Sequence, residues 1–129
     1  MTDVLEANKA LVLAFYQKAL NERDADVADT FLGNRYVQHN PLVEDGPAGL
    51  RRYLGWIAAN VPDPRSEAKR VFADEGIVIL HIHRVRTPGT HGDAIVDLFR
   101  VKDGRIVEHW DVTQPVPETA TNNSDMFRR

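Results

Sequence analysis

Ionisable side chains interrupt apolar segments in the second half of the chain. Asp97 lies between two aliphatic residues, and His109 and Asp111 flank a tryptophan twelve to fourteen positions later. Apolar surroundings raise the pKa of a carboxyl group, so that such a group can accept and return a proton near neutral pH. Two carboxylates and an imidazole that converge in a pocket would therefore suit general acid/base catalysis.

Histidines form a second set of candidates. His81 and His83 are two residues apart, so they share one face if the segment is a strand, and His39 lies in a separate extended stretch. A three-histidine metal site would need the strand pair to meet His39 or His109, and none of the tight spacings typical of metal motifs is present. We therefore predict no metal at these residues.

The composition excludes several other functions. The chain has no cysteine, which excludes disulfides and thiolate chemistry, and it has no Gly-x-Ser-x-Gly or glycine-rich phosphate motif. A net charge of −3 gives no electrostatic reason to bind nucleic acid or an anionic membrane. No apolar run approaches the ~20 residues that span a bilayer, and the first residues lack the layout of a signal peptide. We therefore expect a cytoplasmic protein.

The periodicity of the apolar residues predicts the elements that hold these groups. The 129 residues, 43% of them apolar, are expected to form a single domain over residues 1–129. Helical spacing predicts helices over 3–21, 24–31 and 46–60, with an extended stretch at 36–41. Strand candidates follow at 67–72, 77–86, 93–101 and 105–113, and the short turns between them imply antiparallel neighbours. This order predicts an α+β domain with the helices on one side of the sheet.

The length of the turn around residues 103–104 determines which side chains of the last two strands share a face of the sheet. A two-residue loop places Asp97 opposite Trp110, whereas a three-residue loop with a glycine bulge places Asp97 opposite His109. Hydrophobic matching favours the bulged loop. That register gathers on one face Asp97, Phe99, His109 and Asp111.

Apolar residues at even positions predict a second buried surface on the other side of the sheet. They are too many for a solvated face, so we expect a second copy of the chain to cover them in a two-fold dimer. The residues are Val78, Leu80, Ile82, Val96, Leu98, Ile106, Trp110 and Val112. At the end of the chain, Met126 and Phe127 follow a polar linker, and we expect them to dock near the pocket mouth as part of a lid.

Three segments resemble the SnoaL-like polyketide cyclases, a family in the nuclear transport factor 2-like superfamily, which includes ketosteroid isomerase. They are Tyr-Val-Gln-His-Asn-Pro at 36–41, the strand pair at 97–112 with its Glu-His-Trp-Asp sequence, and the chain end with Asn122, Asn123, Met126 and Phe127. The resemblance covers nearly the whole chain. It implies a cone-shaped α+β barrel, in which three N-terminal helices pack on a curved antiparallel sheet that encloses a pocket. It also implies a homodimer formed through the outer face of the sheet.

The resemblance assigns roles to particular residues as well. In the characterised cyclases, an aspartate on the last strand is the general acid/base of an intramolecular aldol closure, without metal or cofactor, and its match is Asp111. A second pocket residue corresponds by spacing to Asp97, where the aromatic polyketide cyclases tend to have histidine. Our own hypothesis adds that Asp97 and His109 tune this acid/base, while His39 and His83 polarise or orient a carbonyl group. The expected lining residues are Tyr16, Trp56 and Phe99.

We therefore expect a cofactor-free aldol condensation or related enolisation of a small apolar carbonyl compound. One alternative is hydrolysis or isomerisation of a small apolar substrate by the same carboxylates. Epoxide hydrolases of this superfamily use an Asp-Arg-Asp arrangement, but Arg84 and Arg100 are expected on the face opposite the odd-numbered residues. Another alternative is a non-catalytic module that binds a small ligand. The burial of Asp111 beside a cavity, or its exposure and pairing with a surface cation, would distinguish these alternatives.

Overall fold

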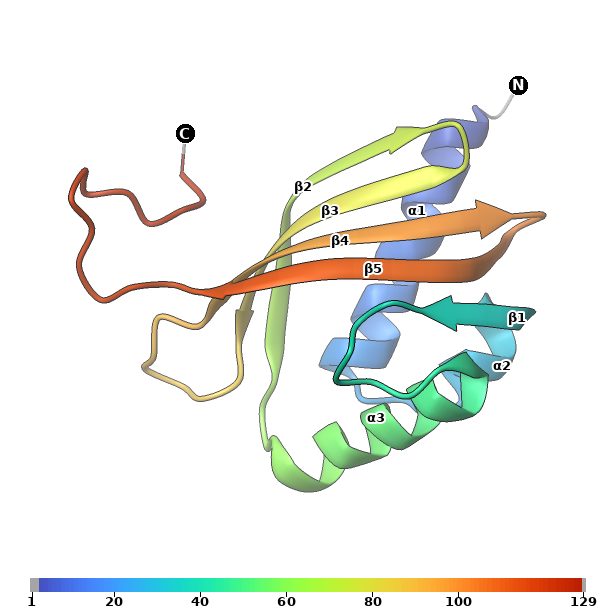
Figure 1. Cartoon of the computed structure of the whole chain (residues 1–129), viewed down its shortest axis with the longest axis horizontal. Helices are drawn as coiled ribbons and strands as arrows, with labels where there is room; N and C mark the ends of the chain where they lie inside the picture. The colour runs from blue at the N-terminus through green and yellow to red at the C-terminus, as the bar shows by residue number, and fades with distance from the viewer. Residues whose placement is uncertain (1–2, 129) are drawn as a thin grey trace.

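The computed structural model describes residues 3–128 as helices packed on one face of a curved sheet (Figure 1). No helix in this range is long and apolar enough to cross a membrane. The helical elements are α1 (Val4–Tyr16), the π-helical turn η1 (Gln17–Asn21), α2 (Val27–Phe31) and α3 (Gly46–Asn60). The strands are β1 (Leu32–Gln38), β2 (Arg65–Asp74), β3 (Ile77–Val85), β4 (Asp93–Lys102) and β5 (Arg105–Pro115).

Helix α1 runs along the concave face of the sheet and fills the core there (Figure 1). Asp3 caps its first turn by accepting a hydrogen bond from the backbone N–H of Leu5. At its C-terminal end the helix widens into η1, where the Asn21 side chain both donates to and accepts from the backbone of Ser66. This double hydrogen bond ties the helix to the start of β2. Tyr16, the last residue of α1, consequently has a fixed position above the sheet.

The sheet is mixed, which corrects the expected all-antiparallel sheet. Its strand order is β1-β5-β4-β3-β2, and the four strands β2 to β5 are antiparallel neighbours, as predicted. The first half of the extended stretch predicted at 36–41 is the end of a fifth strand, β1, which ends at Gln38 and pairs in parallel with β5. The strands β1 and β2 form the two opposite edges of the sheet, and helix α3 lies between them in the chain. The helix predicted over 46–60 is confirmed.

Neither predicted register describes the β4–β5 hairpin. Its turn has two residues, and both Asp103 (φ 52°) and Gly104 (φ 73°) have the positive φ of a tight hairpin turn. The bulge lies within β5 instead, where Val107 is the extra residue between two ladder pairs. A Cβ atom on Gly33 of β1 would lie 2.9 Å from Val107 Cγ1, so that glycine makes room for the bulge. The bulge sets Asp97 opposite Asp111.

The prediction of which β3 side chains lie on the outer face of the sheet is wrong. In the β3–β4 pair Leu80 lies opposite Asp97, so the even positions of β3 share a face with the odd positions of β4. Three residues assigned to the outer surface, Val78, Leu80 and Ile82, are therefore fully buried beneath the helices, as is Ile106 of β5. Val96 and Val112 remain on the outer face, as expected, and are 41% and 72% exposed.

The C-terminal tail docks on the sheet, but not as a lid over a pocket. The Phe127 ring packs on His81 and His83, with ring centroids 5.2 and 4.5 Å apart. The Arg70 guanidinium of β2 donates a 2.7 Å hydrogen bond to the Phe127 carbonyl oxygen. These partners lie on the outer face, so the tail covers the side of the sheet opposite the helices.

Candidate functional site

The helices and the sheet enclose a small inner chamber beside a wider mouth. The inner chamber has a volume of about 50 Å³, and its lining includes Phe15, Tyr16, Phe99, Asp97, His109 and Asp111. The mouth has a volume of about 460 Å³, and its lining includes Leu42, Tyr53, Trp56, Arg84, Arg86 and Thr113. Asn40, Val43, Tyr53 and Arg84 line both spaces, so a ligand in the mouth adjoins the inner chamber.

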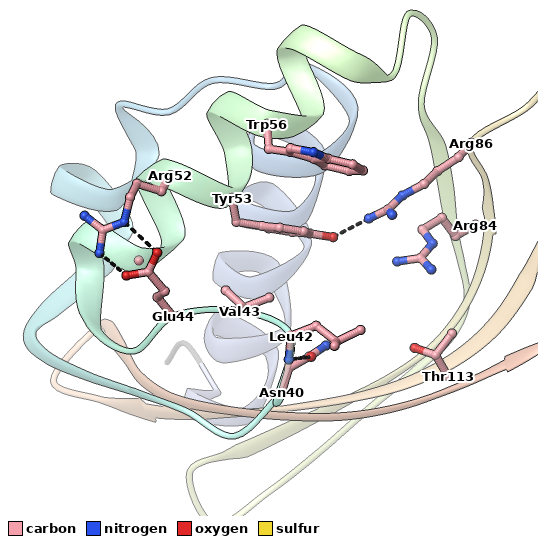
Figure 2. Close-up of a pocket in the computed structure, with 11 residues that line it drawn as sticks. Asn40, Leu42, Val43, Glu44, Arg52, Tyr53, Trp56, Arg84, Arg86 and Thr113 are labelled. Carbon is pink, nitrogen blue, oxygen red and sulfur yellow. Dashed lines mark hydrogen bonds and ion pairs between the residues drawn. The ribbon is translucent and has the colours of Figure 1, made fainter.

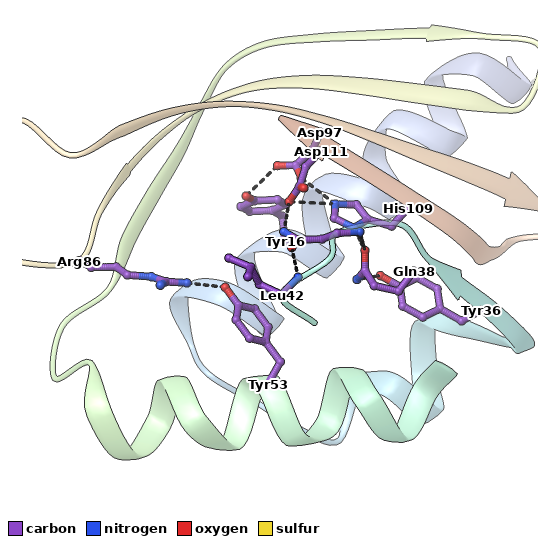
Figure 3. A network of polar contacts seen from close by, with 10 residues as sticks. Tyr16, Tyr36, Gln38, Leu42, Tyr53, Arg86, Asp97, His109 and Asp111 are labelled. Atoms are coloured by element: carbon purple, nitrogen blue, oxygen red, sulfur yellow. Dashed lines mark hydrogen bonds and ion pairs between the residues drawn. The ribbon is translucent and has the colours of Figure 1, made fainter. Parts of the chain in front are cut away.

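Asp97 is the buried centre of the polar network in the inner chamber (Figure 3). Its side chain points from β4 toward α1, where the Tyr16 phenol donates a 2.9 Å hydrogen bond to Oδ2. Its other oxygen, Oδ1, lies 2.7 Å from His109 Nε2. Both carboxyl oxygens of Asp97 are therefore engaged with neighbouring side chains, which leaves this group to position others and makes it a poor direct base.

The tautomer of His109 follows from its second contact. The backbone N–H of Asn40 donates to Gln38 Oε1 at 2.9 Å, which identifies that atom as the amide oxygen. His109 Nδ1 lies 2.7 Å from the same oxygen, so Nδ1 must carry a hydrogen and donate it. A single further proton is then shared between His109 Nε2 and Asp97 Oδ1. The pair is either imidazolium with carboxylate or neutral imidazole with carboxylic acid.

Asp111 is the carboxylate that faces the open part of the chamber. Its Oδ2 accepts a 2.9 Å hydrogen bond from Asn40 Nδ2 and lies 3.9 Å from His109 Nε2. No group within residues 3–128 donates a hydrogen bond to Oδ1, and the side chain is 14% exposed. No arginine or lysine among these residues forms an ion pair with Asp111. Asp111 is therefore half-buried beside a cavity and is not paired with a surface cation in the described part of the chain.

Two tyrosines in the site stay protonated over a wide pH range. Burial, with Asp97 nearby, raises the pKa of Tyr16 well above its ordinary value. Burial likewise raises the pKa of Tyr36, whose hydroxyl group accepts a hydrogen bond from Gln38 Nε2 at 3.3 Å. Tyr16 is therefore a permanent hydrogen-bond donor to Asp97 near neutral pH.

The three ionisable groups of the chamber are also close enough to ligate a cation. One atom each from Asp97, His109 and Asp111 lies within 4.8 Å of the others. In the structure these atoms form hydrogen bonds with one another or with Tyr16 and Asn40. A cation at this position would have to replace the short contact between His109 and Asp97. The arrangement fits a hydrogen-bond network better than a metal centre.

Two predicted pocket residues lie elsewhere. His39 projects to the outer face, where its ring stacks on Trp110 at 4.9 Å and its Nε2 contacts Glu108 at 2.8 Å. His83 also lies on the outer face, against Phe127, and donates through Nε2 to the His91 carbonyl oxygen. Neither can polarise a carbonyl group in the chamber. The other predicted residues line the chamber, except Trp56, which lies at the mouth.

Sequence reasoning missed several site residues that were next to the residues it chose. Gln38 and Asn40 flank His39, and because strand side chains alternate, they point into the chamber when His39 points out. The same alternation was misapplied to Arg84, which was expected on the outer face. It lies on the inner face, where Nε and Nη2 contact Asp93 Oδ2 at 3.3 and 2.9 Å.

Comparison with known proteins places this architecture in a family. The model of the SnoaL-like domain matches residues 12–109. No curated protein matches the chain. Among solved structures, AclR from Streptomyces galilaeus, provisionally described as a hydroxylase, has 25% identity and a TM-score of 0.72, with 88% of this chain and 82% of that chain covered.

Two further structures have the same fold at lower identity. An LEH-like epoxide hydrolase from M. tuberculosis has 22% identity and a TM-score of 0.70, with 87% and 86% of the two chains covered. A protein from Acidithiobacillus ferrooxidans, provisionally described as a polyketide cyclase, has 16% identity and a TM-score of 0.71, with 87% and 91% covered. The fold is thus shared by proteins of different described activities. The family match, which spans most of the chain, shows that this protein belongs to the SnoaL-like domain family, with the nuclear transport factor 2-like fold.

Proposed function

We propose that this protein is a cofactor-free enzyme that enolises a small carbonyl compound and closes a carbon–carbon bond by aldol addition. The observation that carries the proposal is the position of Asp111. Its carboxylate borders a chamber lined by Phe15, Phe99 and Ile95, with one oxygen held by Asn40 and the other without a hydrogen-bond donor among residues 3–128. A fixed carboxylate in partly apolar surroundings is suited to removing a proton from carbon.

The proposed reaction needs only one proton carrier. Asp111 removes a proton from the carbon between two carbonyl groups, and the electron pair moves onto the carbonyl oxygen as an enolate. The enolate carbon then attacks a second carbonyl carbon of the same molecule, which forms the new bond. The oxygen of that carbonyl takes the proton back from Asp111, so that no other reactant is consumed. A narrow chamber favours this closure because it holds the two reacting carbons together.

The residues around Asp111 would position the catalytic groups and stabilise negative charge on the substrate. Asp97 orients His109, whose Nε2 lies 3.9 Å from Asp111 Oδ2, and Tyr16 holds Asp97 in place. Arg84 lines the chamber with its guanidinium, of which Nε and Nη2 are engaged by Asp93. The remaining nitrogen, Nη1, is suited to stabilise negative charge on a substrate oxygen.

Hydrolysis of an epoxide is a second candidate, because Arg84 lies on the same face as the two aspartates. Asp111 would remove a proton from water, the water oxygen would bond to carbon, and the shared proton of the His109–Asp97 pair would pass to the departing oxygen. The site differs from an Asp-Arg-Asp arrangement in one respect. His109 takes the place of the arginine: its Nε2 lies 2.7 Å from Asp97 Oδ1 and 3.9 Å from Asp111 Oδ2. Arg84 is instead paired with Asp93. The aldol reaction is therefore the better supported.

A substrate screen with matched variants tests the proposal. Small diketones, aromatic polyketide-like compounds and small epoxides would be incubated with the wild type, Asp111→Asn and Asp103→Asn. The last is the same chemical change in an exposed turn, at a φ of 52° that asparagine tolerates. We expect cyclisation of a carbonyl compound that Asp111→Asn slows at least about a hundredfold and Asp103→Asn does not affect. Turnover of epoxides alone would favour the second candidate, and ligand binding without any turnover would show a binding module.

A further inference from the structure

The mouth of the pocket contains an arginine whose charge is not balanced by a carboxylate. Of the three arginines that line it, Arg52 pairs with Glu44 at 2.7 Å and Arg84 pairs with Asp93 at 2.9 Å. Arg86 has no carboxylate within ion-pair distance among residues 3–128. The mouth therefore carries a positive charge although the protein as a whole has a net charge of −3.

Aromatic side chains hold that charge in place. Tyr53 and Trp56 project from α3 toward Arg86 across the mouth (Figure 2). The Arg86 guanidinium carbon lies 5.8 Å from the Tyr53 ring centroid and 5.5 Å from that of Trp56, and Nη2 donates to the Tyr53 hydroxyl group. These contacts restrict the guanidinium without neutralising it, because aromatic faces bring no formal charge. The remaining N–H groups of Arg86 are suited to a carboxylate, which the planar guanidinium binds in a bidentate manner.

Exposed apolar side chains border the same opening. Trp56 is 50% exposed although it belongs to a helix whose other face packs in the core, and Leu42 on the facing loop is 91% exposed. Both line the mouth. Large apolar groups that remain exposed around a cavity commonly mark a site where a ligand buries them. A ligand seated in the mouth would reduce the exposure of these side chains.

We infer that the mouth binds a planar aromatic acid, with the carboxylate on Arg86 and the ring against Trp56. The inference deepens the proposed function and rests on it in one respect: the bound acid is taken to be the compound whose carbonyl groups reach Asp111. The expected small carbonyl substrate is then anionic at one end and apolar at the other. Arg84, which lines both the mouth and the inner chamber, would contact the middle of such a molecule.

Two probes of the same shape, one anionic and one neutral, test whether the mouth recognises a negative charge. Calorimetric titration would compare 1-naphthylacetate with 1-naphthylacetamide, which has the same ring and a neutral head group. We expect the wild type to bind the acid about tenfold more tightly than the amide. In Arg86→Gln this preference should disappear, with amide affinity unchanged, which shows that the mouth remains folded. Arg51→Gln is the matched control, because Arg51 is on the same helix, pairs with Asp29, and lies outside the mouth.

Several outcomes would overturn the inference. They are equal affinity of the wild type for the two probes, no binding of either at about 1 mM, or an acid preference that Arg86→Gln retains. A loss of preference in Arg51→Gln equal to that in Arg86→Gln would also overturn it, because the effect would then follow net charge. Asp111→Asn separates this site from the catalytic proposal. It should bind the acid at least as tightly as the wild type, so intact acid binding without Asp111-dependent turnover would refute the proposed function alone.

Discussion

The hydrogen bond from Tyr16 to Asp97 makes a quantitative prediction. In Tyr16→Phe the ring remains, but Asp97 Oδ2 loses its only donor within the described residues while it is 2% exposed. Water cannot easily replace that donor. With Asp97 as the carboxylate of the pair, a hydrogen bond to this charged group contributes about 1.5–3 kcal/mol to stability. We expect the free energy of unfolding to fall by about 2–3 kcal/mol, which corresponds to a Tm lower by roughly 6–12 °C for a domain of this size.

A double-mutant cycle attributes the loss to this pair. In Asp97→Asn the amide can accept from Tyr16 and donate to a neutral His109 whose Nδ1 still donates to Gln38, so all groups remain satisfied. The single change should therefore cost at most about 1 kcal/mol. Once Asp97 is uncharged, removal of the Tyr16 hydroxyl should cost about 1–2 kcal/mol less than it does in the wild type.

Tyr36→Phe is the control for the cycle, since Tyr36 is equally buried but accepts only a long, neutral hydrogen bond from Gln38. Its loss should be at most about 1 kcal/mol. Urea denaturation of the four proteins of the cycle and of this control gives the required free energies. If Tyr16→Phe changed stability no more than Tyr36→Phe, or if the cycle showed no coupling, the buried network would not have the energetic importance assigned to it.

Three further predictions concern the outer face. Burial and the neighbouring Arg70 lower the pKa of His81. Below about pH 6.5 the unfolded chain therefore binds protons more readily than the folded one, and the protein should become less stable as the pH decreases. The urea midpoints at neutral and mildly acidic pH should differ less in His81→Gln than in the wild type. Phe127→Ala should cost up to about 2 kcal/mol of stability and leave turnover per folded molecule unchanged, because the tail packs away from the pocket; a selective loss of activity would argue for a lid. We propose that a second copy of the chain covers the apolar outer face, so sedimentation should give a dimer that Val112→Glu dissociates, and a wild-type monomer at micromolar concentration would contradict it.

The sequence predicts elements far better than it predicts which way strands face. Helical periodicity places α3 correctly, and the four C-terminal strands follow from their alternation and their turns. The facing of β3 could not be derived from its own residues, because the loop over residues 86–92 can change the parity of the β3–β4 register without any local signal. His83 was consequently assigned to the pocket and Arg84 to the outer face, and both assignments are wrong.

The site itself could be predicted in part. Asp97, His109 and Asp111 share one face because a bulge at Val107 shifts the register, and that bulge depends on Gly33 in a strand far away in sequence. The predicted face was therefore right although the predicted register was not. The partners of these groups depend on where α1 and β1 lie over the sheet. Contacts such as Tyr16 with Asp97 and Asn40 with Asp111 join residues about 70 to 80 positions apart, which no local pattern reveals.

The central claim is that Asp111 carries the proton, and its most direct test is Asp111→Asn with turnover and stability measured on the same preparation. The amide oxygen of the substituted side chain can still accept the hydrogen bond from Asn40, and the change removes one of two carboxylates that lie opposite each other in the β4–β5 ladder. We predict that turnover falls about 10²–10⁴-fold, or roughly 3–5 kcal/mol in activation free energy, while the free energy of unfolding stays the same or rises. A variant destabilised by about 1–3 kcal/mol that keeps full activity per folded molecule would contradict the claim, because Asp111 would then be a structural anchor.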